Sequence, residues 1–170
     1  MIRIGINGFG RIAKCLFLIL NNNPEFKIVA INHYNLNLEE LKLLIKYDTI
    51  YNNIDNNVKI KNNSLLVNGT KIRLLKYSKP NEIPWNKYNV QYIIDTTGKF
   101  IDYNDLAGHL NTSIERIILT SPSKTVPMFI NGINTNLLKD NKIISASSCT
   151  SNCLIPILYI LNKEYGIVDR

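Results

Sequence analysis

Apolar residues near the start of the chain switch between two spacings, which predicts alternating strands and helices. Residues 2–7 are rich in isoleucine and are predicted to form a short buried strand. After Gly10 the apolar residues recur with helical spacing. They are Ile12, Leu16, Ile19 and Leu20. Because residues 27–32 form a second apolar run, the pattern predicts a βαβ unit.

The same alternation continues along the chain, with one interruption. Helices are predicted around Leu38, Leu41, Leu44 and Ile45, and over residues 103–110. Parallel strands are predicted at residues 92–95, 116–120 and 142–145. The interruption is a set of β-like runs at residues 58–61, 65–67 and 72–75, with Asn68-Gly69 as a hairpin turn. We therefore predict an α/β fold, a doubly wound and mostly parallel sheet with a small antiparallel part.

The last segment has helical spacing over residues 150–165, and Gly166 marks its end. One stripe of this helix is apolar and holds Leu154, Ile157, Leu158 and Leu161. Residues 167–170 resemble the start of another strand. Such a stripe normally covers a sheet, so we expect the chain by itself to associate through this helix.

Composition and charge exclude several classes of protein. The 20 Lys and Arg against 13 Asp and Glu give a net charge of +7, but they are scattered along the sequence and do not form an aromatic-interleaved basic stripe, which argues against nucleic-acid binding. The sequence lacks an apolar stretch long enough for a membrane span and a secretory signal, so a soluble cytoplasmic protein is expected. The three cysteines are expected to be reduced thiols. Cysteine and histidine residues lack the spacing of a metal site, and no metal is expected.

A glycine-rich turn between the first strand and the first helix is the clearest binding motif. Gly8, Gly10 and Ala13 fit the G-x-G-x-x-G/A fingerprint of dinucleotide-binding, or Rossmann-type, domains. Gly8 permits the tight turn, Gly10 lets a pyrophosphate approach the backbone, and Ala13 allows close packing of helix and strand. The helix N-terminus then offers free N–H groups to the phosphates.

The end of the second strand departs from this fingerprint. An acidic residue is expected there to hold the ribose hydroxyls, but the sequence has His33. A neutral imidazole offers one acceptor in place of the two oxygens of a carboxylate. The interpretation stays open between a solvated loop histidine and a ribose contact, and between NAD and NADP as cofactor.

Cys149 falls in the first turn of the last predicted helix, after the serines at positions 147 and 148. Free N–H groups and the helix dipole favour the thiolate, which is the nucleophilic form. Cys153 lies beside Leu154 and Ile157 and is predicted to be an inert core thiol.

These motifs together resemble the glyceraldehyde-3-phosphate dehydrogenase family. The resemblance spans essentially the whole chain and includes the run at residues 4–12 and Ser148-Cys149-Thr150. Further matching segments in family order are Val29-Ala30-Ile31-Asn32, Lys46-Tyr47-Asp48, Thr97-Gly98, Gly108-His109-Leu110, Pro127-Met128-Phe129 and Asn152-Cys153-Leu154.

The resemblance implies a glycolytic oxidoreductase that oxidises a phosphorylated aldehyde with NAD and inorganic phosphate. Cys149 would be the catalytic nucleophile, and Ser148 and Thr150 would hold phosphate. The cofactor-binding residues it implies are Asn7, Gly8, Gly10, Arg11, Ile12, Asn32, His33, Gly98 and Thr120. Residues 1–148 would form the dinucleotide-binding domain, and residues 149–170 would open an incomplete catalytic domain. The family is typically tetrameric.

Departures from the family leave alternatives open. His33 replaces the usual ribose Asp, Ser78 replaces an Arg often found near the adenine, and Ala146-Ser147 replaces Asn-Ala. The family's general-base histidine and phosphate-binding arginine correspond to positions beyond Arg170, so we expect the chain by itself to be incomplete. The alternatives are a non-catalytic nucleotide-binding remnant and erythrose-4-phosphate dehydrogenase.

Overall fold

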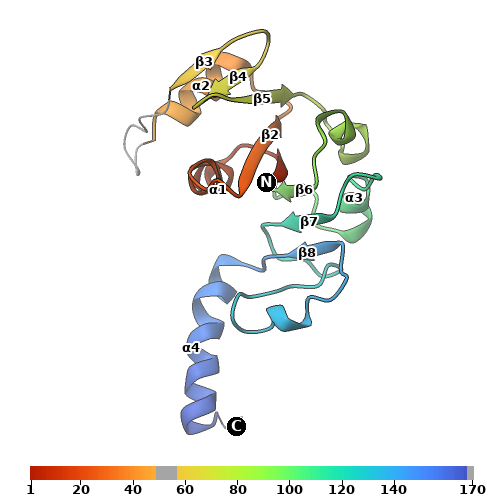
Figure 1. The fold of residues 1–170 in the computed structure, drawn as a ribbon. Helices are drawn as coiled ribbons and strands as arrows, with labels where there is room; N and C mark the ends of the chain where they lie inside the picture. Colours follow the sequence, from red (N-terminus) through yellow and green to blue (C-terminus); the bar gives the residue numbers. More distant parts are fainter. Residues whose placement is uncertain (49–56, 168–170) are drawn as a thin grey trace.

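A computed structural model describes residues 1–48 and 57–167 of the chain. Within them, eight strands form one sheet in the order β3-β4-β5-β2-β1-β6-β7-β8. The parallel part comprises β5 (Thr70–Leu75), β2 (Phe26–Asn32), β1 (Ile2–Asn7), β6 (Tyr92–Asp95), β7 (Arg116–Leu119) and β8 (Ile143–Ser145). The predicted α/β fold with a mostly parallel sheet is confirmed (Figure 1).

The predicted antiparallel part is a small extension at one edge of this sheet. The strands β3 (Val58–Ile60) and β4 (Leu65–Val67) pair antiparallel, and β4 pairs antiparallel with β5. Asn68 and Gly69 join β4 to β5 with φ angles of 48° and 84°. Two consecutive positive φ angles are those of a type I′ turn, so the hairpin predicted at these residues is confirmed.

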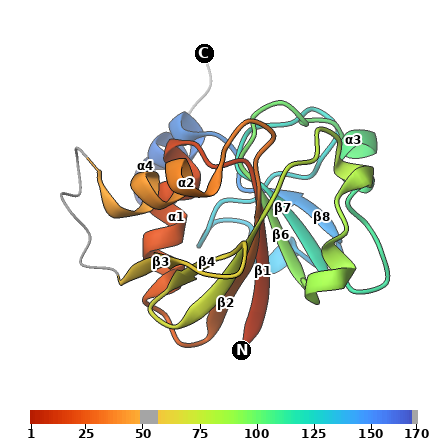
Figure 2. The ribbon, with the colours of Figure 1, turned by 90° about the horizontal axis from the view of Figure 1, so that it is seen from above.

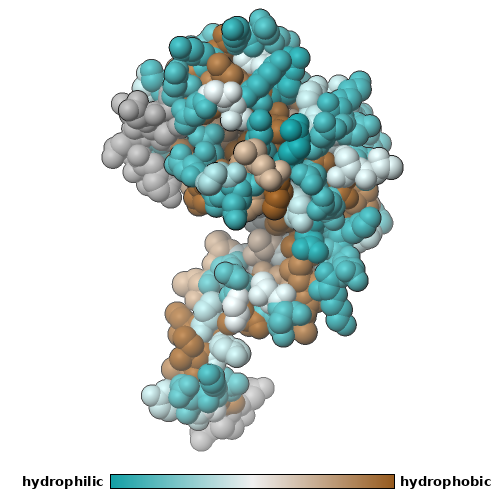
Figure 3. Space-filling model, viewed as in Figure 1, coloured by the Kyte–Doolittle hydropathy of each residue, from teal (hydrophilic) through white to brown (hydrophobic). Residues whose placement is uncertain are grey.

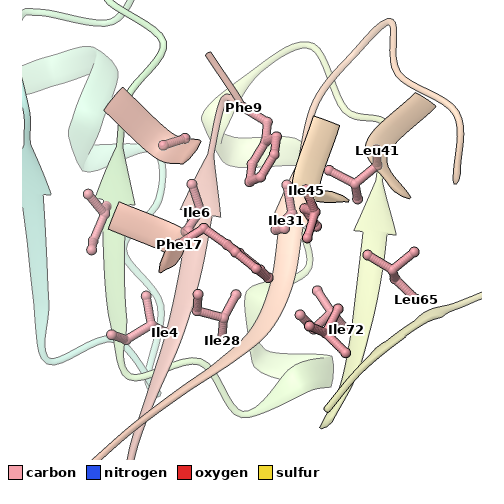
Figure 4. Close-up of a cluster of buried hydrophobic side chains, with 13 residues drawn as sticks. Ile4, Ile6, Phe9, Phe17, Ile28, Ile31, Leu41, Ile45, Leu65 and Ile72 are labelled. Atoms are coloured by element: carbon pink, nitrogen blue, oxygen red, sulfur yellow. The ribbon is translucent and has the colours of Figure 1, made fainter. Parts of the chain in front are cut away.

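Helices cover both faces of the sheet and divide the core into two clusters (Figure 2). The helices α1 (Arg11–Asn21) and α2 (Leu38–Lys46) lie on one face, where Phe17 and Leu41 are buried. Figure 4 shows this cluster, in which side chains of both helices meet those of β1 and β2. The helix α3 (Tyr103–Ala107) and the 3₁₀ segment η2 (Trp85–Tyr88) cover the other face.

Short 3₁₀ segments and one helix boundary differ from the sequence prediction. η1 (Pro80–Glu82), η2 and η3 (Thr135–Leu137) are not predicted by the apolar spacing, because each is too short for a period. The helix predicted over residues 103–110 ends at Ala107. Gly108 follows it, and a Cβ there would lie 3.2 Å from the backbone nitrogen of Asn81. The close approach of η1 therefore accompanies the end of this helix.

The last helix, α4 (Cys149–Tyr165), extends away from the sheet (Figure 1). None of its residues is buried, and its apolar side chains form brown areas along the projecting helix in Figure 3. Besides the predicted stripe, Ile155 and Ile160 are exposed on other sides of the helix. A helix that is apolar all round is normally buried, so α4 has the surface of a helix that packs against further protein. The strand predicted at residues 167–170 falls largely outside the described residues.

No helix within the described ranges combines the length and the hydrophobicity that crossing a membrane requires.

We predict that the 170-residue chain associates with itself through α4, because association removes this apolar surface from water. Light scattering should report an oligomer for the unmodified chain and a monomer for the double variant Leu154→Lys/Ile157→Lys. The matched control Lys163→Gln, on the same helix, should remain oligomeric. A monodisperse monomer from the unmodified chain would show that α4 does not self-associate.

Candidate functional site

A cavity of about 500 Å³ opens at the carboxyl ends of the central strands. It lies beside the turn between β1 and α1 and the segments that follow β2, β5 and β6. Its lining residues are Asn7, Gly8, Phe9, Gly10, Asn32, His33, Tyr34, Tyr77, Ser78, Thr96, Thr97, Lys99 and Phe100. Ligands of open α/β sheets bind at this edge, where the strand order reverses. Here the reversal lies at β1, which has β2 on one side and β6 on the other.

The glycine turn forms one wall of the cavity and admits no side chain at Gly8. The backbone N–H of Gly8 donates to the carbonyl of Asn32 at 2.8 Å, which fixes the turn against the end of β2. The φ angle of Gly8 is 89°, and a Cβ would lie 2.9 Å from Oγ1 of Thr96. The predicted tight turn at Gly8 therefore depends on the absence of a side chain.

The N-terminus of α1 is open toward a ligand. Its N-cap is Gly10, which provides no capping side chain, and no acidic residue occupies the first turn. A Cβ at Gly10 would meet no atom within 4 Å. The first N–H groups of a helix lack partners within the helix and favour an anion. The open start of α1 and the volume of the cavity both fit a dinucleotide whose pyrophosphate lies at the start of α1.

Beneath the cavity, a chain of buried hydrogen bonds joins the strand ends. The side-chain N–H of Asn7 donates to Oδ2 of Asp95 at 2.7 Å, and that of Asn32 donates to Oδ1 of Asn7 at 2.8 Å. Asn32 also accepts from the backbone N–H of Tyr77 at 2.9 Å. These contacts connect β6, β1, β2 and the segment after β5, and they make a rigid floor.

His109 extends this network to the opposite face of the sheet. It is buried, and its Nδ1 accepts from the indole N–H of Trp85 at 3.0 Å. An indole N–H can only donate, so the ring hydrogen of His109 belongs on Nε2. Nε2 lies 3.2 Å from Oδ2 of Asp95 and donates to it. His109 is therefore a positioning group for Asp95, a role that the spacing of the sequence does not reveal.

His33 lies at the end of β2 and lines the cavity where the ribose of a dinucleotide is expected. Burial lowers the pKa of His33 below its usual value, while the negative charge of Glu40 acts in the opposite direction. The backbone N–H of Asn35 lies 3.4 Å from Nδ1. The structure thus places His33 at the cavity wall as a neutral side chain at neutral pH.

Four of the residues predicted to bind cofactor do not line the cavity. Arg11 turns to Asp48, with 2.6 Å between Nη1 and Oδ2, and Lys14 reaches the same carboxylate at 2.9 Å. Ile12 is about half exposed on α1. Thr120 donates through Oγ1 to the carbonyl of Asp95.

Gly98, the fourth, has a φ angle of 64° and falls between two lining residues, Thr97 and Lys99. By contrast, Asn7, Gly8, Gly10, Asn32 and His33 are brought together at the cavity.

Several cavity residues were not singled out by the sequence. Tyr34, Tyr77, Thr96, Lys99 and Phe100 all follow the carboxyl ends of strands. The rule that ligands bind at these ends could have identified them once the strands were assigned. Phe9 lies in the glycine-rich turn, where the predicted binding residues are Gly8 and Gly10. Thr97 precedes Gly98, which is the predicted binding residue of that segment.

Cys149 is exposed at the first position of α4, beyond the carboxyl end of β8 and so at the same edge of the sheet as the cavity. Oγ of Ser148 caps the helix by accepting from the backbone N–H of Ser151 at 3.0 Å. The same oxygen lies 3.0 Å from Oγ1 of Thr150. The three residues of the predicted nucleophile motif thus share one helix start.

Cys153 is exposed, so the prediction that it is a core thiol is wrong for the described structure. The reason is that no described element covers α4. Cys149 and Cys153 are both free thiols. Over residues 1–48 and 57–167, no three His, Cys, Asp or Glu side chains gather as a metal site would require.

Comparisons with known proteins agree with this geometry. Residues 2–103 match the family model described as glyceraldehyde 3-phosphate dehydrogenase, NAD binding domain. The chain is 36% identical over 169 residues to glyceraldehyde-3-phosphate dehydrogenase of Buchnera aphidicola. These residues cover 99% of the chain and 51% of that protein.

Two further relatives give the same result. Glyceraldehyde-3-phosphate dehydrogenase 1 of Giardia intestinalis is 38% identical, over 99% of the chain and 50% of the relative. The cytosolic glyceraldehyde-3-phosphate dehydrogenase of Trypanosoma brucei brucei is 35% identical, over 99% of the chain and 51% of the relative. The chain therefore spans about half the length of the curated relatives it matches.

We predict that Gly8→Ala lowers the free energy of unfolding more than Gly69→Ala does. Both positions have positive φ, which costs a residue with a Cβ about 1–2 kcal/mol. Only at Gly8 does the new Cβ also meet other atoms within 4 Å. Urea unfolding of the two variants measures the difference; equal losses would mean that Thr96 moves aside without cost.

Proposed function

This chain belongs to the glyceraldehyde 3-phosphate dehydrogenase family, and from this membership we propose that it binds NAD and supplies the nucleophile for oxidation of a phosphorylated aldehyde. Residues 1–148 would be the dinucleotide-binding domain, and residues 149–170 would begin the catalytic part. The observation that supports NAD binding most directly is the uncapped start of α1 beside the Gly8 turn and the cavity.

In this proposal the cavity holds the dinucleotide across the strand ends. The first N–H groups of α1 donate to the pyrophosphate, and the Gly8 to Ile12 turn keeps the backbone close to it. Asn32 and His33 lie on the ribose side, while Gly98 and Thr120 belong to the segments after β6 and β7. Bound NAD supplies a nicotinamide ring that accepts a hydride.

Cys149 would perform the covalent step. Its thiolate would form a bond to the aldehyde carbon, and the carbonyl oxygen would become an oxyanion. Loss of hydride from that carbon to the cofactor would restore the carbonyl and leave a thioester on Cys149. Inorganic phosphate then attacks the thioester carbon and releases the acyl phosphate and the Cys149 thiolate. Oγ of Ser148 and Oγ1 of Thr150, which flank the thiol, would donate hydrogen bonds to that phosphate.

The surroundings of Cys149 also support a second candidate, a nucleotide-binding chain without turnover. The chain has two histidines, and neither is placed as a base for the thiol. His109 is buried against Trp85 and Asp95, and His33 lines the cofactor cavity. Proton transfer by a positioned base typically contributes about 10²–10⁴-fold to a rate.

Cytoplasmic location and assembly into a homotetramer are further parts of the proposal. Two relatives are named as cytosolic enzymes. The exposed apolar surface of α4 is consistent with assembly.

We predict that His33→Asp tightens NAD binding about tenfold and weakens NADP binding. A carboxylate accepts two hydrogen bonds from the ribose hydroxyls, and one charged hydrogen bond is worth roughly 1.5–3 kcal/mol. It would also repel the phosphate of NADP. Calorimetric titration with both cofactors measures this, with His33→Asn as the uncharged control. Unchanged affinity for both cofactors would place the ribose away from His33, and absence of NAD binding by any variant would refute the cofactor proposal itself.

We predict that these 170 residues react with iodoacetamide at Cys149 yet show little phosphate-dependent NAD reduction with glyceraldehyde 3-phosphate. Cys149 is exposed at a helix start, whereas His109 is buried against Trp85 and Asp95 and His33 lines the cofactor cavity. Peptide mass spectrometry compares its alkylation rate with that of Cys153, which is exposed on the same helix. Faster labelling of Cys153, or rapid NAD reduction by this chain, would contradict the assignment.

A further inference from the structure

A concave basic surface lies at the amino ends of the central strands, at the opposite end of the sheet from the cofactor cavity. It encloses about 380 Å³ and is lined by five cationic side chains, Arg3, Lys27, Lys71, Arg73 and Lys87. Figure 2 helps to place it, because N marks the end of the chain where β1 begins, and Arg3 is the second residue of that strand. We call these five residues the basic groove. Within residues 1–48 and 57–167, no acidic residue lines it.

The fold gathers charges that are scattered along the sequence. Arg3 and Lys27 are paired in register on neighbouring strands β1 and β2. Lys71 and Arg73 lie on β5, the strand on the other side of β2. Like charges on neighbouring positions of a sheet destabilise it. A cluster of this kind is therefore costly unless an anion compensates it.

In the described part of the chain, these cations form no ion pair with a carboxylate. Among the residues the structure describes, the ion pairs involve Arg11, Lys14, Lys42 and His109, and none includes a residue of the basic groove. The five charges therefore act together on the space that they line.

The two arginines are held in place by neutral groups. Arg3 donates to the backbone carbonyls of Tyr88 at 2.7 Å and Asn89 at 3.0 Å. Arg73 donates to the carbonyl of Asn63 at 2.7 Å. A guanidinium has five N–H donors, so both arginines retain free donors and full charge in a fixed position. Preorganised donors of this kind lower the entropic cost of binding an anion.

We propose that the basic groove binds a small molecule that carries several phosphate groups, as an inorganic or nucleoside oligophosphate does. The volume falls within the range of small-molecule sites. Val29 and Tyr88 also line it and add an apolar and an aromatic side chain beside the charges. Because the groove and the cofactor cavity share no lining residue, the oligophosphate and NAD bind simultaneously.

Calorimetric titration of the protein with inorganic tripolyphosphate tests this site. We expect one molecule to bind per chain, with an affinity that falls as salt is raised and does not change when NAD is saturating. Lys27→Gln/Lys71→Gln should weaken binding about tenfold or more, since two of the five charges are lost. The control Lys124→Gln/Lys142→Gln removes the same charge outside the groove and should bind as the unmodified protein does.

Further arms separate the other outcomes. ATP that binds more tightly than tripolyphosphate, with the same loss in the double variant, would assign a nucleotide to the site. Lys87 lies in η2 and not in a strand, so Lys87→Gln leaves the sheet unchanged. Weaker tripolyphosphate binding by this variant supports the proposed site even if the double variant does not fold. Equal affinity of all variants, or full displacement by NAD, would overturn the proposal. Tighter binding of oligonucleotides with increasing length would overturn it in favour of a nucleic acid.

Discussion

The carboxylate of Asp95 is the buried charge around which the cofactor end of the sheet is organised. Its side chain is fully buried, and it accepts hydrogen bonds from Asn7, Thr97 and His109. A carboxylate buried without such partners costs several kcal/mol, so removal of one donor affects the whole strand edge. Through Asn7 the network reaches Asn32, whose carbonyl receives the N–H of Gly8. The geometry of the glycine turn therefore depends on a charge beneath it.

This network is possible only because a glycine lets an aromatic ring pack against the sheet. A Cβ at Gly5 would lie 2.6 Å from the ring of Trp85. Any residue with a side chain at position 5 would therefore exclude the indole from this place. The indole N–H then fixes the tautomer of His109, and His109 donates to Asp95. Packing on one face of the sheet and the polar floor of the cavity are thus coupled through Trp85.

The sequence predicts the strands and long helices well because the spacing of apolar residues within each segment is characteristic of a strand or of a helix. It also predicts the turn at Gly8, since its conformation excludes other residues. It does not reveal the roles of Trp85 and His109, which are set by contacts between residues far apart in the chain. The basic groove is hidden for the same reason: Arg3 and Arg73 come together only when β1, β2 and β5 are adjacent. The burial of Cys153 was predicted wrongly because apolar neighbours on a helix do not supply the surface that covers it.

The two ends of the central strands differ in how their polar groups are satisfied, and this difference separates their functions. At the carboxyl ends, Asn7, Asn32 and Asp95 satisfy one another, so the N–H groups at the start of α1 remain for a ligand. At the amino ends, Arg3 and Arg73 donate to neutral carbonyls, and the described residues give them no ion pair. A ligand at the first end gains fixed dipoles at short range, whereas a ligand at the second gains Coulomb attraction that salt weakens. The same parallel strands can therefore hold a dinucleotide at one end and a compact polyanion at the other without competition.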